Sequence, residues 1–338
     1  MLQSKERLLQ LNSKLAQTLT EKGVEATADE TTTSLVDKVA EISGGGDELP
    51  DWDDDSPIIA SGVSFIGTKW QLTKKGTLRW IFTEGDTHAG QSYSALSIID
   101  LGYQKIASKI RQMYIEDGFL SVGVFYAINC ERIRFPNTLT EQTRYGVLSS
   151  LKESDLSNDM YSEITTYFHS NFHNLENVKL SSKLTTLPTR SFCQCYSLKE
   201  INLENVTIFK NYCLYENFSL EKDIVFNAGL MSIEDNAFAR TRIKSITFQQ
   251  PTGEYPTISS TAFSQCRNIS EVNLFDGWNM DLHLQSSNLT QASLHDMIEK
   301  YADMTGQTSP VMNVGTTNLD KIDDEHKVMA TAKNVTLA

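Results

Sequence analysis

The sequence predicts a mainly β chain with some α-helix, in which a solenoid of stacked repeats lies between a helical N-terminal segment and a small α+β C-terminal cap. Three observations predict this arrangement: apolar residues recur every twenty to thirty residues, an acidic glycine-rich stretch follows the start, and helical apolar spacing occurs near both ends. We expect five segments: 1–43, 44–57, 58–109, 110–285 and 286–338.

The first segment, 1–43, has the pattern of two short helices. Its apolar residues fall three and four apart, the first helix ends at Lys22-Gly23, and the second begins near the run Thr31–Thr33. Helices this short bury little by themselves. We therefore expect anchoring to a larger particle or oligomerisation, with a hairpin folded on its own chain as the alternative. The candidate docking residues are Leu8, Leu11, Leu15, Leu19, Leu35 and Val39.

Residues 44–57, GGGDELPDWDDDSP, combine three glycines with six mutually repelling acids. They predict a solvated linker, since the glycine and the terminal glutamate of a calcium-binding loop are missing. The next segment, 58–109, is predicted to be an entry β module. Its stretch TKWQLTKKGTLRWIF has the pattern of strand, turn and strand, and so predicts a hairpin.

The repeat is visible in copies that begin 23, 22, 23 and 26 residues apart. Most copies contain a short x-Leu-x alternation and then a small-aromatic pair such as Ala237-Phe238. Each copy therefore predicts one turn of a solenoid, which buries its apolar side only against its neighbours. The third copy carries one extra residue. The copies start at Leu175, Leu198, Leu220, Ile243 and Ile269.

An earlier copy is clear at Ile110–Pro136, whereas 137–170 keeps only scattered apolar positions and is predicted to be a degenerate or expanded turn. Cys195 and Cys266 recur three residues after a phenylalanine. The five cysteines form no CxxC pair, which favours reduced, buried thiols. A small, partly polar residue stacking in register explains Cys195 and Cys266 without chemistry.

These copies resemble the BspA-like leucine-rich repeats, whose pattern runs roughly I-x-x-V-x-I-x-x-G-V-T-x-I-G-x-x-A-F-x-x-C-x-x-L. The stretch IRQMYIEDGFLSVGVFYAINCERIRFP is similar to this pattern, and TKWQLTKKGTLRWIF is similar to the entry segment that often precedes such arrays. The resemblance covers about residues 68–275 and implies a leucine-rich-repeat solenoid. The copy at Leu198 departs from the pattern, because it lacks both the phenylalanine and the cysteine.

Both ends resemble segments of phage proteins. Residues 8–43 are similar to the N-terminal helical segment of tail and baseplate proteins of phages that infect Gram-positive bacteria, and 293–338 are similar to the tail that ends many phage and surface repeat proteins. This resemblance implies a virion structural protein that contacts other virion proteins, forms a homo-oligomer, with a trimer favoured, and is made in the bacterial host cytoplasm. Within the tail, helical spacing predicts one apolar face that covers the last repeat, formed by Leu294, Met297, Ile298 and Tyr301.

Composition and motifs exclude several function classes. A net charge of −13 disfavours a nucleic-acid partner, and no run of eighteen apolar residues or signal-peptide core indicates a membrane or secretion segment. The sequence has no phosphate-binding loop, no G-x-S-x-G and no H-E-x-x-H, and its six histidines are scattered. We therefore expect no enzyme, no catalytic residues, no cofactor and no metal.

Aromatic residues beside the repeats are the remaining functional signal. Aromatic rings with Asn and Asp suit sugar faces, so we expect contacts to a host cell-wall glycan or surface protein at Tyr212, Tyr215, Tyr255 and Trp278. The leading prediction is a phage tail, baseplate or fibre component that attaches to host cells. The alternatives are a bacterial surface or host-interaction adhesin, a head fibre or decoration protein, and a carbohydrate-active enzyme on the particle.

Overall fold

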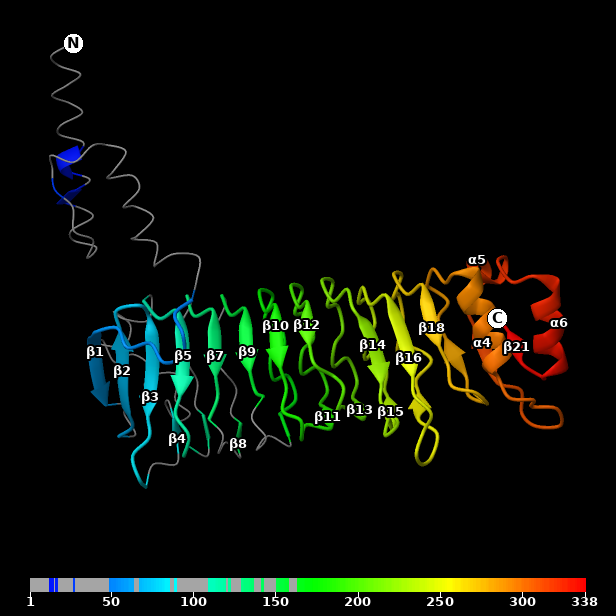
Figure 1. Ribbon diagram of the computed structural model, residues 1–338, viewed down its shortest axis with the longest axis horizontal. Coiled ribbons are helices and arrows are strands. Elements are labelled where there is room, and N and C mark those ends of the chain that lie inside the picture. Colours follow the sequence, from blue (N-terminus) through cyan, green and yellow to red (C-terminus); the bar gives the residue numbers. More distant parts are fainter. Residues whose placement is uncertain are drawn as a thin grey trace, which may run out of the picture.

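The computed structural model of the chain is an elongated row of coils that follow one another in chain order (Figure 1). The row begins with an antiparallel hairpin and ends with the C-terminal helices. The predicted docking residues Leu8, Leu11, Leu15, Leu19, Leu35 and Val39 lie outside the described residues. The described residues are 12–14, 16–17, 27, 49–63, 67–85, 88–89, 109–119, 121–122, 129–136, 141–142, 150–157 and 163–338.

The predicted hairpin is present and starts the main sheet. Strands β2 (Lys69–Thr73) and β3 (Thr77–Ile81) pair antiparallel around Gly76, with β1 (Ile58–Val63) outside β2. Strand β3 then pairs in parallel with the first strand of the repeats. The entry module is therefore continuous with the array. The sheet continues in parallel through β5 (Gln112–Ile115), β7 (Arg132–Arg134), β9 (Glu153–Asp155), β10 (Asn177–Lys179) and β12 (Glu200–Ile201).

A second main sheet continues the row after a break. The break falls between β12 and β14, where the copy that starts at Leu220 has its extra residue. An inserted residue shifts the backbone N–H groups out of register with the carbonyls of the preceding strand. The carbonyl of Ile201 accepts from Lys222 Nζ at 3.0 Å in place of a backbone donor. A shallow hollow of about 360 Å³ opens beside these residues. The strands of this sheet are β14 (Asp223–Phe226), β16 (Ser245–Phe248) and β18 (Glu271–Asn273).

Besides the strand that belongs to a main sheet, a coil has two further sides. One side carries short parallel strands and the other a run of turns, and equivalent backbone groups of successive coils bond to each other on both. These three hydrogen-bonded sides explain how coils of little more than twenty residues stay stacked. The short strands are β4 (His88–Ala89), β6 (Ser121–Val122) and β8 (Glu141–Gln142) in one sheet, and β11 (Thr186–Leu187), β13 (Ile208–Phe209), β15 (Ser232–Ile233) and β17 (Thr257–Ile258) in another.

Columns of buried apolar residues run through the array. Val178 lies opposite Ile201, and Ile246 lies between Ile224 and Val272 in the other sheet. All of these side chains are buried, and burying one such side chain contributes roughly 1.5–3 kcal/mol. The prediction of a mainly β, leucine-rich-repeat-like fold with few helices is confirmed.

The cysteines occupy the position that the sequence predicts. Cys195 Sγ donates to the carbonyl of His169 at 3.1 Å, and Cys266 Sγ donates to that of Phe238 at 3.0 Å. In the coil after that of Cys195, Asn217 Nδ2 donates to the carbonyl of Phe192 at 3.1 Å. All five thiols are free and buried. This column is structural, because each small polar side chain satisfies a carbonyl of the preceding coil.

The prediction of a degenerate turn over 137–170 is wrong in its described part. Strand β8 is the last strand of the sheet that starts with β4, and β9 continues the main sheet between β7 and β10. The repeat is hidden because Ser154 takes the apolar centre of β9; it is buried and its Oγ lies 2.7 Å from Nε2 of His169. Burial lowers the pKa of His169 to about 3, so this ring is neutral and forms a polar pair inside the core.

The prediction of a solvated linker over 44–57 is contradicted at Trp52 and Asp54, whereas Asp51, Asp53 and Asp55 are exposed. Asp54 is buried and accepts hydrogen bonds from the hydroxyls of Thr73 and Thr77. Trp52 lies under the guanidinium of Arg132, 4.1 Å from the ring centroid. These contacts join residues that are far apart in the sequence. The local run of acids predicted an open connector because it does not reveal this packing against the first strands.

The C-terminal cap has the predicted helical face. In α4 (Gln291–Lys300), Leu294, Met297 and Ile298 are buried, and Ser293 Oγ accepts from the backbone N–H of Val272 at 2.9 Å. The helix thus pairs part of the open edge of β18. None of the helices in the described ranges is long and apolar enough to cross a bilayer. The other cap elements are β19 (Leu282–His283), β20 (Val311–Asn313), α5 (Thr316–Leu319), α6 (Asp324–Ala332) and β21 (Thr336–Leu337).

Candidate binding surface

The run of turns in each coil has a repeated backbone conformation. Arg190 (φ 57°) and Gln194 (φ 60°) are both left-handed and flank the inward-facing Phe192. The same pair of positive φ values recurs one coil earlier and in the two coils that follow. The N–H groups of these three residues donate to the next coil at 2.8–3.0 Å. Equivalent side chains therefore stack at the spacing of adjacent strands.

The first left-handed position of each turn forms a ladder of tyrosine and arginine. The guanidinium of Arg190 lies 5.8 Å from the ring centroid of Tyr167 and 5.0 Å from that of Tyr212. Tyr167 is 48% exposed, so its ring is available to a partner. Among the described residues, Arg190 forms no salt bridge. It is a cation held between two aromatic rings, with its remaining donors free for a ligand.

Tyr215 and its neighbours extend this ladder by one coil. The rings of Tyr212 and Tyr215 meet edge to face at 5.3 Å, and the guanidinium of Arg240 lies 5.9 Å from the Tyr215 ring. Glu216 accepts from Arg240 at 2.6 Å and from Gln194 at 2.9 Å. Desolvation opposes ionisation of Glu216, but these hydrogen bonds outweigh it and lower its pKa. Desolvation and the adjacent carboxylate raise the pKa of Tyr215, which stays a neutral hydroxyl.

A second ladder of stacked rings runs beside the first. His173 and Tyr196 are parallel with centroids 4.6 Å apart, and Tyr196 stacks on Phe218 at 5.3 Å. Phe218 is 39% exposed. Both ladders lie on the turn side of consecutive coils. We call this set the aromatic turn surface: Tyr167, His173, Arg190, Tyr196, Tyr212, Tyr215, Phe218 and Arg240.

The backbone under the first ladder is strained for the side chains it carries. A left-handed conformation costs a residue with a Cβ roughly 1–2 kcal/mol, and asparagine tolerates it best after glycine. The next coil has Asn236 at this position, whereas Tyr167, Arg190 and Tyr212 keep bulky side chains at φ 57–61°. Residues held at a conformational cost are concentrated at functional sites, which makes this ladder a candidate for binding.

The predicted contact residues separate in the structure. Tyr212 and Tyr215 belong to the aromatic turn surface. Tyr255 is 46% exposed but lies outside that surface and stacks on Phe275 at 5.7 Å. The sequence could have pointed to Arg190, because it holds the same place in its copy as Tyr167 and Tyr212, but a search limited to aromatic residues passed over it.

Trp278 is not a surface residue, so the prediction that it contacts a receptor is wrong. Its side chain is fully buried against Phe248 and Phe275, with ring centroids 4.9 and 5.0 Å away. Its Nε1 donates to the carbonyl of Met280 at 2.9 Å. The indole therefore fills the junction between the last repeat and the cap.

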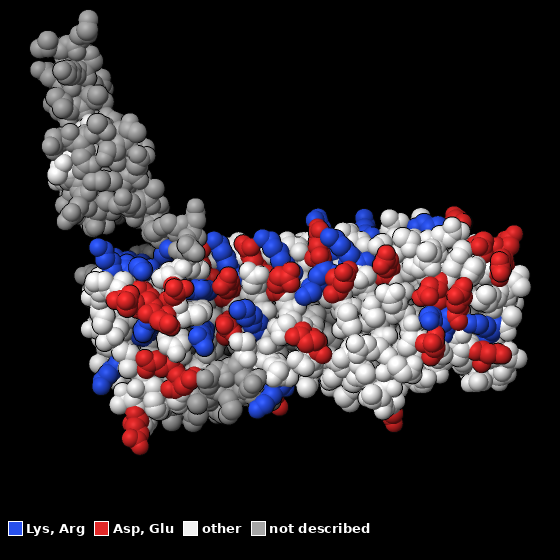
Figure 2. Space-filling view, in the orientation of Figure 1, with Lys and Arg blue, Asp and Glu red and all other residues white. Residues whose placement is uncertain are grey.

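The strand side has a different character, because its charges are paired across coils. Glu131 lies between Arg111 and Lys152, at 3.1 and 2.7 Å, and the pattern continues with Glu176 and Lys199 at 2.6 Å. Figure 2 shows acidic and basic side chains interspersed along the row. Opposite charges paired in this way leave little net field for a ligand. The aromatic turn surface is the stronger candidate.

Comparison with known proteins identifies the repeats. Residues 107–221, 148–270 and 213–303 match the BspA type leucine rich repeat region, with six copies. Together these matches span more than half of the 338 residues. No curated protein matches the chain.

Two solved structures are similar over part of their length. A leucine-rich repeat protein from Bacteroides ovatus is 18% identical over 49% of each chain, with a TM-score of 0.36. A leucine rich cell surface protein from Faecalibacterium prausnitzii is 12% identical over 83% of this chain and 98% of that one, with a TM-score of 0.25. The chain thus spans about half the length of the Bacteroides ovatus protein. Both likenesses are too distant to indicate a ligand.

Proposed function

Because the chain belongs to the BspA-type leucine-rich repeat family, we propose that it is a non-enzymatic binding protein of the bacterial cell-surface type, which binds an extracellular partner through its repeats. The observation that carries this proposal is the aromatic turn surface, where tyrosine and arginine stack over consecutive coils at a conformational cost. The structural core does not require these side chains, since inward residues such as Phe192 form it.

The chemistry of this surface favours a flat, hydroxylated or carboxylated partner. Tyrosine rings offer apolar faces on which a sugar ring or an aliphatic side chain can lie. Arg190 offers planar donors for a hydroxyl or a carboxylate. Tyrosine and arginine are also the residues that contribute most to protein interfaces. An extracellular glycan or a surface protein meets these requirements.

The proposal is tested with the untagged chain on arrays of purified cell-wall glycans, host glycans and extracellular matrix proteins. The variant Arg190→Ala/Tyr212→Ala is expected to lower affinity for the partner at least about tenfold, because each truncated anchor costs 1–2 kcal/mol or more. Lys179→Ala/Val225→Ser on the strand side is the matched control and keeps wild-type affinity. Equal binding by both variants, or no binding by the wild type to any ligand, contradicts the proposal.

A second candidate function is a phage tail, baseplate or fibre protein, or a head decoration protein. What favours it is the resemblance of residues 8–43 to the N-terminal segment of phage tail and baseplate proteins, and of 293–338 to the tail of phage and surface repeat proteins. The matched family and solved structures include no phage protein. Antibodies against the chain distinguish the two candidates in electron micrographs. Labelling of the bacterial envelope supports the surface protein, whereas labelling confined to virus particles supports the virion protein.

Oligomerisation through residues 1–43 belongs to this second candidate, because the expectation of a trimer comes from the resemblance to phage fibre proteins. We propose a trimer joined by the N-terminal leucines, with Leu8→Asp/Leu15→Asp as the disrupting variant. Light scattering after size-exclusion chromatography should give a trimer for the wild type and a monomer for this variant. Ser13→Asp, at an exposed helical position, is the control and stays trimeric. A monomeric wild type contradicts the proposal.

A further inference from the structure

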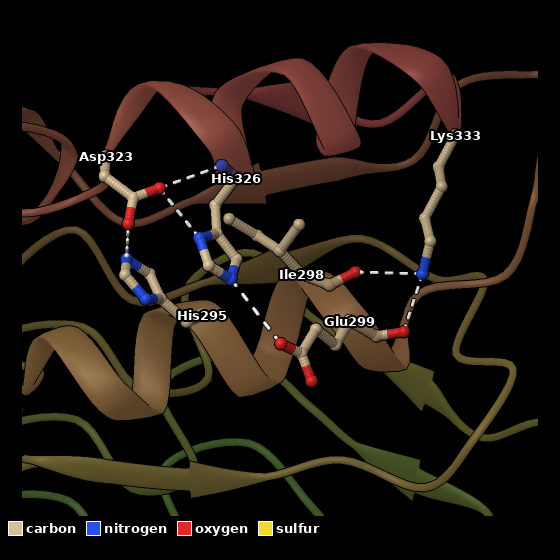
Figure 3. Close-up of polar contacts among 6 residues, drawn as sticks. All are labelled: His295, Ile298, Glu299, Asp323, His326 and Lys333. Carbon is tan, nitrogen blue, oxygen red and sulfur yellow. Dashed lines mark hydrogen bonds and ion pairs between the residues drawn. The ribbon is translucent and has the colours of Figure 1, made fainter.

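Two histidines and two carboxylates meet between helices α4 and α6 of the cap (Figure 3). His295 and Glu299 are four residues apart and share one face of α4. Asp323 is the N-cap of α6, and His326 lies three residues further on. The two helices bring these pairs together although they are far apart in sequence. None of these residues belongs to the aromatic turn surface.

The separation of His295 from Asp323 suits two ligands of one metal ion better than a direct hydrogen bond. One ligand atom each from His295, Asp323 and His326 lies within 4.8 Å of the others. His295 Nε2 is 3.5 Å from Asp323 Oδ2, which is long for a hydrogen bond. Two ligands that each lie about 2.0–2.1 Å from a tetrahedral zinc ion are separated by about 3.3 Å. The observed separation is therefore close to that of two ligands of one ion.

His295 Nε2 also lacks a hydrogen-bond partner. The atom is buried, and within the described part of the chain it has the long ion-pair contact with Asp323 but no hydrogen bond. A buried polar atom without a partner is costly, so it calls for an explanation. The rings of His295 and His326 stack with their centroids 3.6 Å apart and 10° between their planes. A metal bound at this nitrogen supplies the partner.

The framework around the group is already fixed. Asp323 Oδ1 accepts from the backbone N–H of His326 at 2.9 Å and lies 2.7 Å from Nδ1 of the same residue. Lys333, just past α6, donates to the carbonyls of Ile298, Glu299 and Tyr301 at 3.2, 2.6 and 2.8 Å. Figure 3 shows the contacts of Asp323 and those of Lys333 with Ile298 and Glu299. Because the two rings are stacked and nearly parallel, an imidazole has to rotate about χ2 before both lone pairs reach one ion.

The geometry points to a zinc-binding site formed by His295, Asp323 and His326, with Glu299 or water as the fourth ligand. Imidazole nitrogen with carboxylate oxygen in four-fold coordination suits Zn²⁺, whereas Mg²⁺ requires six oxygen ligands. Glu299 Oε1 lies 3.5 Å from His326 Nε2 and can approach by side-chain rotation. A bound ion joins α6 to α4, which covers β18, and so stabilises the C-terminal end of the array.

The test is zinc titration of the untagged full chain after chelator treatment, by calorimetry and thermal unfolding. The wild type should bind one Zn²⁺, unfold at a higher temperature with it, and show no such rise with Mg²⁺. Bound Co²⁺ should give the visible absorption of a four-coordinate site. His295→Gln and His326→Gln should each weaken binding at least about tenfold, as loss of a ligand does. Glutamine also suits the N3 position of α6, so that helix start is kept.

Two controls separate ligand loss from misfolding. His283→Gln lies in β19 of the same cap, outside the group, and should bind Zn²⁺ as the wild type does. Circular dichroism without metal should be the same for all variants. The site is refuted if the wild type binds no Zn²⁺ at about 100 μM, a hundredfold above a micromolar dissociation constant. It is equally refuted if well-folded His295→Gln and His326→Gln bind as tightly as the wild type.

Discussion

Trp278→Ala should detach the C-terminal cap from the last repeat. The side chain is fully buried between Phe248 and Phe275, and truncating such an aromatic costs about 3–5 kcal/mol. Its hydrogen bond adds little to this cost, because the carbonyl of Met280 also accepts from the hydroxyl of Tyr301 at 3.3 Å. The expected loss is therefore about 4 kcal/mol, concentrated at the junction with the cap.

Hydrogen exchange with mass spectrometry measures this loss locally. In a stacked array each coil contacts only its neighbours, so the destabilisation should be local. At 1.4 kcal/mol per tenfold, a loss of about 4 kcal/mol speeds exchange of the α4 amides roughly a thousandfold. The amides of β2 and β3 should keep wild-type protection. Tyr255→Ala is the matched control, since removing its exposed stacking on Phe275 costs about 1 kcal/mol or less. Unchanged α4 protection, or an equal loss along the whole row, refutes this reasoning.

Three further predictions follow from single sites. Desolvation raises the pKa of Asp54, but the hydrogen bonds that its carboxylate accepts outweigh this effect and lower the pKa from 3.8 to about 2. The carboxylate therefore stabilises the fold above pH 4 by about 2 kcal/mol, and this contribution is lost as the pH falls towards 2. Urea unfolding should show this loss in the wild type and not in Asp54→Asn; equal pH dependence would refute it. Tyr212→Asn should change the free energy of unfolding by no more than about 1 kcal/mol, because relief of left-handed strain offsets the lost contact with Arg190. A urea midpoint that indicates a loss above 3 kcal/mol would contradict the strain argument. Burial raises the pKa of Cys130 to about 12 and that of Cys266 to about 11, so a disulfide reagent should modify these thiols only after denaturation. Rapid labelling of either thiol in the native chain would contradict its burial.

The sequence predicts the features that depend on local periodicity. The spacing of the copies, the hairpin around Gly76 and the buried face of α4 each follow from residues close in the chain. The repeat at 137–170 was missed because Ser154 and His169 form a buried polar pair where the pattern expects an apolar residue. A pattern of apolar residues cannot reveal a core position that is satisfied by hydrogen bonds.

The candidate sites depend on contacts that local patterns do not contain. Trp278 and Tyr212 are both aromatic residues beside the repeats, and only the packing decides that one fills the core while the other lies at the surface. Asp54 meets Thr73 and Thr77 across the first hairpin, and His295 meets His326 across two helices. In each case the partner is brought close by the stacking of coils or helices.

The most direct test of the binding surface is hydroxyl-radical footprinting of the chain with and without its partner. Tyr167, Tyr212 and Phe218 should lose reactivity in the complex, because the partner covers the turn side of their coils. Val225 and Met231, which are 47% and 61% exposed elsewhere on the array, should react as before. Protection of Val225 and Met231 with unchanged Tyr212 would place the partner on another side and contradict the account.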